Sequence, residues 1–434
     1  MIGLTSTWRF VGYVKRQNAL AVGAVLILGV VVNLSWTVGL ARSVGAAGTG
    51  LVGLMVATAL VSSLVARLGT DNLLLRSVVR HSSLMRGDPV DAEPADITRS
   101  ALALSVGTAM FGAAFTLVVA LGGGSTKLLA VGLGLTLNVV ISYQYLGSEV
   151  LKGAGRPIAA TALQSLFLPA CLSGCALLFI LLDTISIFNP RVHPTAVLAI
   201  TALGTGVGAA IARGAVRRLM ALRRQGRFTP GPVARMSAPF LSTSLLNLLM
   251  SQGFIAIAAI VLTTDELGAL TVASRVALLV GLPLVAVNFT MAAPILQVAS
   301  REPTDLVSLW RRSAAFATIG ATVLAVTVAL GTAAVVRLFG TAFADLRGAL
   351  LFLIAAQVIN STTGSVGFVL IGYGHEGVLA RTSAAATIVL LAGTVGLGRY
   401  GPVGASCAVL LASLTQNSLN LFYALRVRSA FDGR

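Results

Sequence analysis

The residues from Leu267 to Gln297 read LGALTVASRVALLVGLPLVAVNFTMAAPILQ, an apolar run with a single charged side chain, Arg275. A helix needs about 20 apolar residues to cross the hydrocarbon core of a bilayer. An arginine at the centre of such a helix costs at least about 2.5 kcal/mol. The stretch therefore predicts a transmembrane helix whose arginine faces water, a ligand or a protein partner.

The rest of the chain has the same apolar character. Of its 434 residues, 56% are hydrophobic and 10% are charged, and the mean hydropathy is +0.92. A soluble domain of this length cannot hide so much apolar surface, so the composition predicts an all-α polytopic membrane protein. We predict twelve spans, at residues 19–40, 49–70, 99–121, 128–151, 157–181, 195–216, 236–262, 267–297, 313–336, 347–371, 377–397 and 402–424.

Positive charge alternates between the connections that join these spans. Most of the 31 basic residues lie on every second connection, with the densest cluster between Arg213 and Arg235. Short cytoplasmic loops retain positive charge, so the alternation predicts that both termini lie in the cytoplasm. The other connections hold only Arg42, Lys127, Arg191, Arg337, Arg347 and Arg399.

The net charge of +17 follows from this loop asymmetry, so we expect contact with anionic membrane lipids and no nucleic-acid partner. The chain has three cysteines and three histidines, and they are scattered. Cys171 and Cys175 are one helical turn apart but have no further ligands nearby in sequence. We therefore expect no metal site and no cofactor.

Two parts of the sequence resemble each other at an offset of 219 residues. LKGAG at 151–155 overlays LIGYG at 370–374, and polar residues in the first and fourth spans overlay polar residues in the seventh and tenth. We predict two six-helix bundles related by pseudo-twofold symmetry, residues 1–225 and 226–434, divided near the basic loop. An even number of spans per repeat makes the repeats parallel, as in transporters whose site lies between two bundles.

Charged residues at membrane depth are the candidate functional residues, because they are costly there. Arg67 and Asp71 are one turn apart and Glu149 precedes Lys152 by three residues, so each carboxylate is a candidate both for a structural ion pair and for ion coupling. The predicted substrate-binding residues are the cations and amides Arg275, Arg42, Arg67, Asn33, Gln252, Asn138 and Gln357.

Several segments together resemble the polysaccharide (O-antigen-type) flippases of the multidrug/oligosaccharidyl-lipid/polysaccharide exporter (MOP) superfamily. They are residues 40–51, 68–76, 266–277, 338–343, 372–374 and 400–405, and the resemblance covers nearly the whole chain. It implies two bundles in a V around a central cavity. It also implies translocation of an undecaprenyl-pyrophosphate-linked oligosaccharide by alternating access. Cavity cations would engage the pyrophosphate, a role that Arg275 fits best.

Three other functions compete with this interpretation. A cation-coupled multidrug exporter of the same superfamily would need a carboxylate in the first or seventh span, and neither span contains one. A membrane glycosyltransferase or polymerase would need catalytic acids or a large external loop, but the longest, at residues 182–194, holds only Asp183, so we expect no enzyme. A non-transporting assembly partner stays open, and polysaccharide polymerases or glycosyltransferases are candidate partners.

Overall fold

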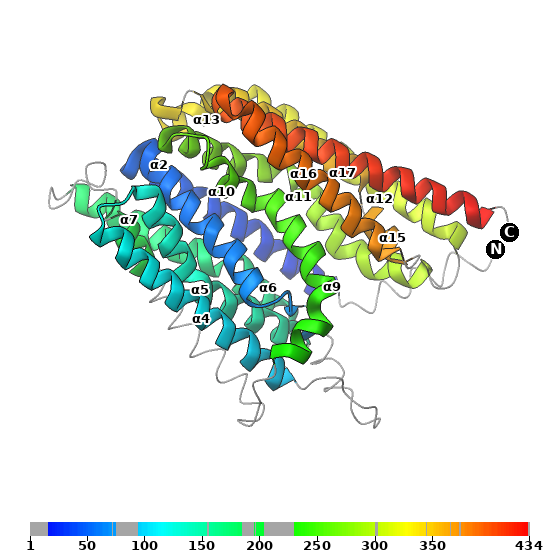
Figure 1. Cartoon of the computed structure of the whole chain (residues 1–434). Helices are drawn as coiled ribbons and strands as arrows, with labels where there is room; N and C mark the ends of the chain where they lie inside the picture. Colours follow the sequence, from blue (N-terminus) through cyan, green and yellow to red (C-terminus); the bar gives the residue numbers. More distant parts are fainter. Residues whose placement is uncertain are drawn as a thin grey trace.

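The computed structural model describes residues 16–71, 73–74, 94–153, 156–184, 195, 197–203, 230–299, 303–343, 345–364, 366–372 and 375–432, and the regular elements within these ranges are all helices (Figure 1). The elements before residue 204 form the N half: α2 (Arg16–Ala66), α4 (Pro94–Leu121), α5 (Thr126–Gly153), α6 (Pro157–Ser165) and α7 (Phe167–Thr184). The elements after residue 229 form the C half: α9 (Pro230–Leu248), π-helix η1 (Leu249–Gly253), α10 (Phe254–Ala258), α11 (Thr264–Ala299), α12 (Pro303–Leu330), α13 (Thr332–Phe339), η2 (Thr341–Phe343), α14 (Leu346–Thr363), α15 (Val366–Gly372), α16 (Glu376–Leu397), η3 (Gly398–Tyr400) and α17 (Gly401–Asp432).

Helix α2 is a hairpin of two rods that are joined at Gly45. This residue has φ 71° and ψ −171°, a conformation that glycine adopts without steric cost. Before the turn, Gly29 lies against Ser165 and the rod follows α6 and α7. After the turn, Met55 lies against Gly134 and the rod runs beside α5, whose direction is opposite to that of α6 and α7. The chain therefore reverses direction inside what is assigned as one helix.

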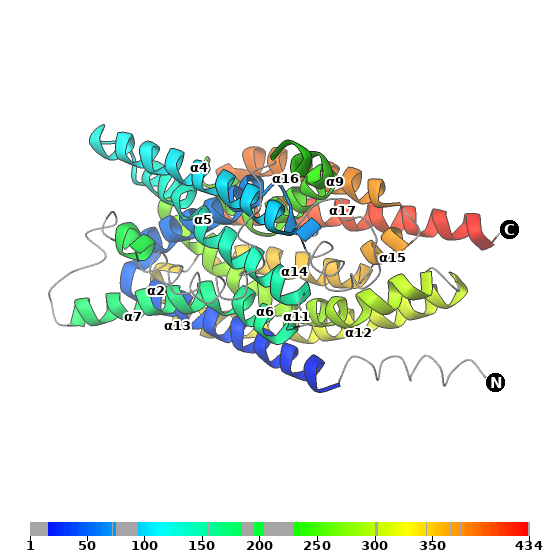
Figure 2. The same ribbon diagram turned by 90° about the horizontal axis from the view of Figure 1, so that it is seen from below.

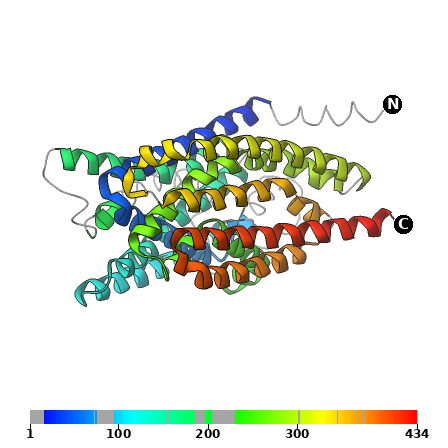
Figure 3. The same cartoon turned by 90° about the horizontal axis from the view of Figure 1, so that it is seen from above.

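The bundle has two ends, the terminal end and the opposite end. The terminal end holds the start of α2 and the end of α17, and the opposite end holds the turns at Gly45, residues 122–125, residues 259–263 and residues 398–401 (Figures 2 and 3). Helices pass from one end to the other in succession. An α-helix rises about 1.5 Å per residue, so the longer rods are long enough to cross a bilayer.

The described residues contain seven helical stretches that are long and apolar enough to span a membrane, or eight if the bent pair α6–α7 is one span. Two of the seven stretches contain a reversal, at Gly45 and at η3. The prediction of a multi-pass all-helical membrane protein is confirmed at this level, whereas the count of twelve is not. The predicted span at 195–216 and the basic cluster at 213–227 fall largely or wholly outside the described residues.

Three spans that the sequence predicted as continuous are broken, and one of them, 313–336, is divided at Gly331 between α12 and α13. Within 157–181, α6 and α7 meet at Leu166 with a bend of 40°. Pro169 lacks the N–H that would bond the carbonyl of Ser165 four residues earlier, which permits this bend. Within 347–371, Gly364 has φ 57° and ends α14 before α15 begins.

One continuous apolar core joins the two halves, and α2 and α11 lie at its centre (Figure 1). It contains Leu51 and Met55 of the N half together with Leu270 and Val276 of the C half. A separate apolar cluster at the terminal end packs Val233 of α9 among residues of α4 and α5. The candidate functional residues are therefore held by two halves of the chain that share a packed seam.

Candidate functional site

Arg275 lies at the end of the first third of α11 and is 9% exposed. Its Nε is buried and has no hydrogen-bond partner among the described residues. Its Nη1 lies 3.4 Å from Oε1 of Gln252, a long contact for a charged donor. The guanidinium forms no ion pair with any described carboxylate. Arg275 therefore retains donor capacity that the protein around it does not use.

Gln252 is presented by η1, a single π-helical turn between α9 and α10. A π-turn carries an extra residue per turn, which changes the direction in which side chains leave the helix, and such turns occur often at functional sites. The structure thus brings together two residues that the sequence predicted as substrate-binding, Arg275 and Gln252, although they lie on different helices.

The other predicted amides are placed differently. Gln357 of α14 faces α11, where its Oε1 lies 2.9 Å from the point at which a Cβ on Gly281 would stand. Asn138 is buried in α5 of the N half, and its Oδ1 has no partner in the described part of the chain. Asn33 is half-buried on the first rod of α2. No hydrogen bond joins these three residues to Arg275.

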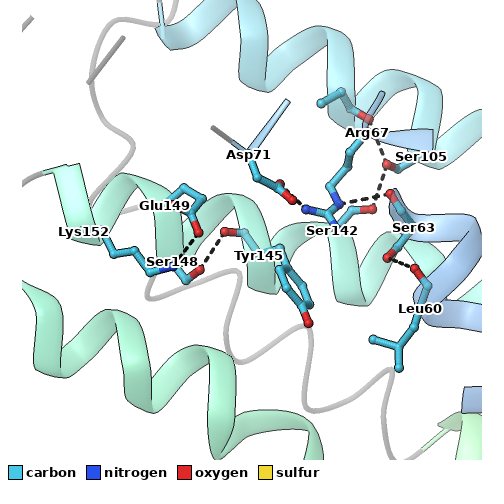
Figure 4. A network of polar contacts seen from close by, with 11 residues as sticks. Leu60, Ser63, Arg67, Asp71, Ser105, Ser142, Tyr145, Ser148, Glu149 and Lys152 are labelled. Atoms are coloured by element: carbon cyan, nitrogen blue, oxygen red, sulfur yellow. Dashed lines mark hydrogen bonds and ion pairs between the residues drawn. The ribbon is translucent and has the colours of Figure 1, made fainter. Parts of the chain in front are cut away.

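Arg67 is also buried, and in contrast to Arg275 it has an ion pair, a hydrogen bond and a ring contact (Figure 4). It is 2% exposed and forms an ion pair with Asp71 one turn later. Its Nε donates to the carbonyl oxygen of Ser63 at 3.0 Å, and its guanidinium carbon lies 4.7 Å from the centre of the Tyr145 ring. Buried ion pairs persist when additional hydrogen bonds and cation–π contacts satisfy them, and this one has both.

Glu149 belongs to the same cluster at the terminal end of the N half (Figure 4). Its Oε1 accepts a hydrogen bond from Nζ of Lys152 at 2.6 Å. The nearby hydroxyls of Ser105 and Ser142 bond each other at 2.9 Å. Both carboxylates predicted for ion coupling are therefore ion-paired, and the four charges of the cluster balance.

Two cations of the N half bind backbone carbonyls of the C half at the opposite end. Nε of Arg42 donates to the carbonyl oxygen of Leu338, at the end of α13, at 2.8 Å. Nζ of Lys127 donates to the carbonyl oxygens of Ala259, at 3.0 Å, and Leu262, just after α10. The carboxyl end of a helix carries partial negative charge and free carbonyls, so both cations act as caps across the seam.

The sequence interpretation assigned Arg42 to substrate and gave Lys127 no role. The only sequence signal for Lys127 was its position as an isolated cation on the side poor in basic residues. Its acceptors are backbone carbonyls, which every residue possesses, so no side-chain pattern marks them.

The two halves also meet backbone to backbone at this end. A Cβ built on Gly268 of α11 would lie 2.0 Å from the carbonyl oxygen of Ala46, and one built on Gly50 would lie 2.2 Å from the carbonyl oxygen of Thr264. No side chain fits at such distances, so glycine at both positions permits the contact. The opposite end of the seam is therefore closed.

Two hollows in the described part of the chain lie away from Arg275. One of about 10 Å³ is enclosed in the N half between Met55 and Leu137. The other, of about 450 Å³, lies in the C half and is lined in part by Trp310 and Thr362. A central cavity at Arg275, which the family resemblance implies, stays a prediction.

Comparison with known proteins gives no match by sequence: no protein-family profile matches the chain and no curated protein does. Solved structures match by fold. A multidrug resistance MATE family transporter in an inward-facing conformation matches with a TM-score of 0.68 and 16% identity, over 96% of this chain and 99% of its own. The lipid II flippase MurJ matches with a TM-score of 0.62 and 15% identity, over 93% and 87%.

A third similar structure is a MOP superfamily transporter from Pyrococcus furiosus, with a TM-score of 0.58 and 16% identity over 96% of both chains. The chain has the fold of the MOP superfamily transporters. At these identities the likeness shows the fold alone. The sequence-based expectation of a MOP superfamily fold is confirmed.

The MOP fold has been seen in two conformations that bear on this chain. An outward-facing MATE structure matches with a TM-score of 0.55, below the 0.68 of the inward-facing one. The fold of this chain is therefore more similar to that inward-facing structure than to that outward-facing one.

Proposed function

We propose that this protein is a flippase that moves an undecaprenyl-pyrophosphate-linked oligosaccharide across the bacterial inner membrane by alternating access. The proposal includes twelve spans in two six-helix bundles, residues 1–225 and 226–434, in a V around a central cavity. It also places both termini, and hence the terminal end, in the cytoplasm. The reversals at Gly45 and at η3 support the higher span count, because each divides one helical stretch into two passes.

The observation that carries the proposal is the unused donor capacity of Arg275. A buried cation without a counter-charge is costly, and proteins keep such groups where a ligand supplies the charge. A pyrophosphate offers two negative charges and several acceptor oxygens, which suits the planar donor fork of arginine. Gln252, 3.4 Å away, adds an amide that suits either a phosphate or a sugar hydroxyl.

A cation-coupled multidrug exporter is the alternative, because MATE transporters share the fold. Against it, α2, α9, η1 and α10 contain no acidic residue that would bind a cationic drug. The Pyrococcus furiosus relative is described as having a binding pocket of reversed polarity that suggests a different function. A cationic site at Arg275 would likewise differ from one made for cations.

The remaining assignments follow from the same proposal. Gln357 lies against α11 and Asn33 and Asn138 lie on N-half helices, where they would contact the glycan as the two bundles move. Asp71 and Glu149 would couple transport to an ion gradient by exchanging their arginine and lysine partners for the ion. Partners would be the lipid-linked oligosaccharide, membrane lipids and polysaccharide polymerases or glycosyltransferases.

The direct test is flipping of a fluorescent polyprenyl-pyrophosphate-linked oligosaccharide in proteoliposomes. Loss of a charged hydrogen-bonding group costs about 1.5–3 kcal/mol, so Arg275→Gln is expected to slow flipping roughly 10- to 100-fold. Arg312→Gln, which removes an exposed arginine elsewhere in the C half, serves as the matched control. A wild-type rate in Arg275→Gln would refute the assignment of this residue.

A second measurement separates the two transporter functions. Deletion of the gene should abolish export of a surface polysaccharide and leave susceptibility to cationic drugs unchanged. Increased drug susceptibility with normal polysaccharide would favour the multidrug exporter.

A further inference from the structure

The hollow of about 450 Å³ in the C half lies between α12, α14 and α17. Its lining combines one cation, one indole, two hydroxyls and four apolar side chains, namely Arg311, Trp310, Thr318, Thr362, Ala314, Ala315, Ile319 and Leu421. Figure 3 shows α12 and α17 on the face toward the viewer with α14 between them. The hollow is therefore a lateral feature of the bundle wall.

The hollow faces away from the seam between the halves. Gly320 packs α12 against Pro283 of α11. At about 100° per residue, the lining positions of α12 point to the side of that helix opposite Gly320. Ile319 and Phe316 are each 66% exposed, as expected for side chains that meet lipid. Whatever occupies the hollow approaches from the bilayer and not from the region of Arg275.

The two ends of the hollow differ in chemistry. Trp310 and Arg311 mark the first residues of the candidate span 310–330 and so lie at the membrane boundary, where tryptophan is enriched. Arg311 is exposed and makes no hydrogen bond or ion pair with the described residues. Ala314, Ala315 and Ile319 follow along α12 toward the membrane interior and form an apolar strip.

The indole of Trp310 is fixed in place by the protein. Its Nε1 donates to the carbonyl oxygen of Thr363 at 2.8 Å. Thr363 in turn bonds Asn417, which is part of a buried amide and hydroxyl network between α14 and α17. The wall beside Arg311 is thus rigid, and little conformational entropy is lost when a ligand enters the hollow.

We propose that this hollow binds an anionic phospholipid of the leaflet at the terminal end. Its phosphate would contact the guanidinium of Arg311 beside Trp310, and its acyl chain would follow the apolar strip of α12. A phosphate headgroup with a chain matches a site that has a cation at the boundary and apolar residues further in. Basic pockets between transmembrane helices on the cytoplasmic side bind such headgroups by the same combination.

Trp310 offers a built-in reporter for the test. The chain has three tryptophans, and replacing Trp8 and Trp36 with Phe leaves Trp310 alone. Trp36 is 2% exposed and its Nε1 has no partner, so the Phe substitution breaks no hydrogen bond within the described structure. The full-length protein is reconstituted in phosphatidylcholine bilayers with brominated phosphatidylglycerol or brominated phosphatidylcholine, and quenching of Trp310 is compared.

Wild-type protein should favour the anionic lipid about fivefold, because one arginine near the headgroups contributes roughly that factor. Arg311→Gln should abolish the preference, whereas the neighbouring Arg312→Gln, which does not line the hollow, should keep it. Equal quenching by both lipids would overturn the proposal. So would an equal loss of the preference for the anionic lipid in Arg311→Gln and Arg312→Gln. Relief of quenching by inorganic phosphate would also overturn it, since the site would then take a free anion and not a lipid.

Discussion

Arg67 and Arg275 are both buried in long helices, yet the protein treats them in opposite ways. Arg67 has an ion pair, a hydrogen bond to Ser63 and a ring contact, whereas Arg275 has one long contact with Gln252 and an unpaired Nε. At the repeat offset of 219 residues, Ala286 corresponds to Arg67 and Val56 to Arg275. At the predicted repeat offset, neither buried arginine therefore has a charged counterpart in the other half.

The difference indicates that the charge of Arg67 stabilises the packing of its helices, whereas the charge of Arg275 does not. The N half balances its buried ions internally. The C half is held by neutral groups: Oγ1 of Thr363 donates to Oδ1 of Asn417 at 2.5 Å, and Nδ2 of Asn417 donates to Oδ1 of Asn360 at 2.6 Å. Nothing in that network contacts Arg275, so its charge is not explained by the packing of its own half.

The largest expected effect is the loss of stability when Arg67 is removed, in contrast to the removal of Arg275. Arg67→Leu leaves Asp71 without its partner and should lower the free energy of unfolding by about 3 kcal/mol, near the lower end for a buried pair because Asp71 is 22% exposed. Arg275→Leu removes an unpaired buried charge and should leave stability unchanged or raise it. Thermal unfolding in detergent, without substrate, measures both.

Arg312→Leu, an exposed arginine, controls for the loss of a positive charge. If Arg275→Leu lowers the unfolding midpoint as much as Arg67→Leu, then Arg275 is structural and the contrast fails.

The next effect in size tests whether neutral groups hold the C half. Asn417→Leu leaves Thr363 and Asn360 with lost partners and should lower the free energy of unfolding by about 2 kcal/mol. Because no ions are involved, the loss should not depend on salt. Thr415→Ala, which removes an exposed hydroxyl from the same helix, is the control. A salt-dependent loss would show that unrecognised charges contribute.

A smaller effect concerns the cations that join the halves. Lys127→Met removes the cap on the carbonyls of Ala259 and Leu262. The lost interaction free energy is about 1 kcal/mol, so the equilibrium between closed and open seam should shift roughly fivefold toward opening at the opposite end. Spin labels at Leu121 and Leu330, in a background without the three native cysteines, report the distance between the halves. An unchanged distance distribution would show that the glycine contacts close the seam alone.

The smallest effect is expected when the whole N-half pair is replaced. Arg67→Leu combined with Asp71→Leu removes both charges, and replacing a buried pair with apolar groups is often close to neutral, so the change should stay within about 1 kcal/mol. A loss equal to that of Arg67→Leu alone, in the same thermal unfolding assay, would mean that the Tyr145 and Ser63 contacts carry the stability.

The sequence by itself determined the membrane class and the helical architecture of this protein. A helix that crosses lipid must be apolar over its whole length, whatever packs beside it, so residues 267–297 predicted α11 to within a few residues. The pair Arg67–Asp71 was also predictable, because residues four apart meet on one helix face.

Only the tertiary structure decided which buried charge has a partner. Gln252 reaches Arg275 from another helix through a π-turn, and Lys127 and Arg42 bind backbone carbonyls, which no residue pattern distinguishes. The bend at Leu166 and the contact of Gly268 with Ala46 likewise depend on neighbours distant in sequence. Hydrophobic length is a property of a segment, whereas the satisfaction of a donor depends on what other segments bring to it.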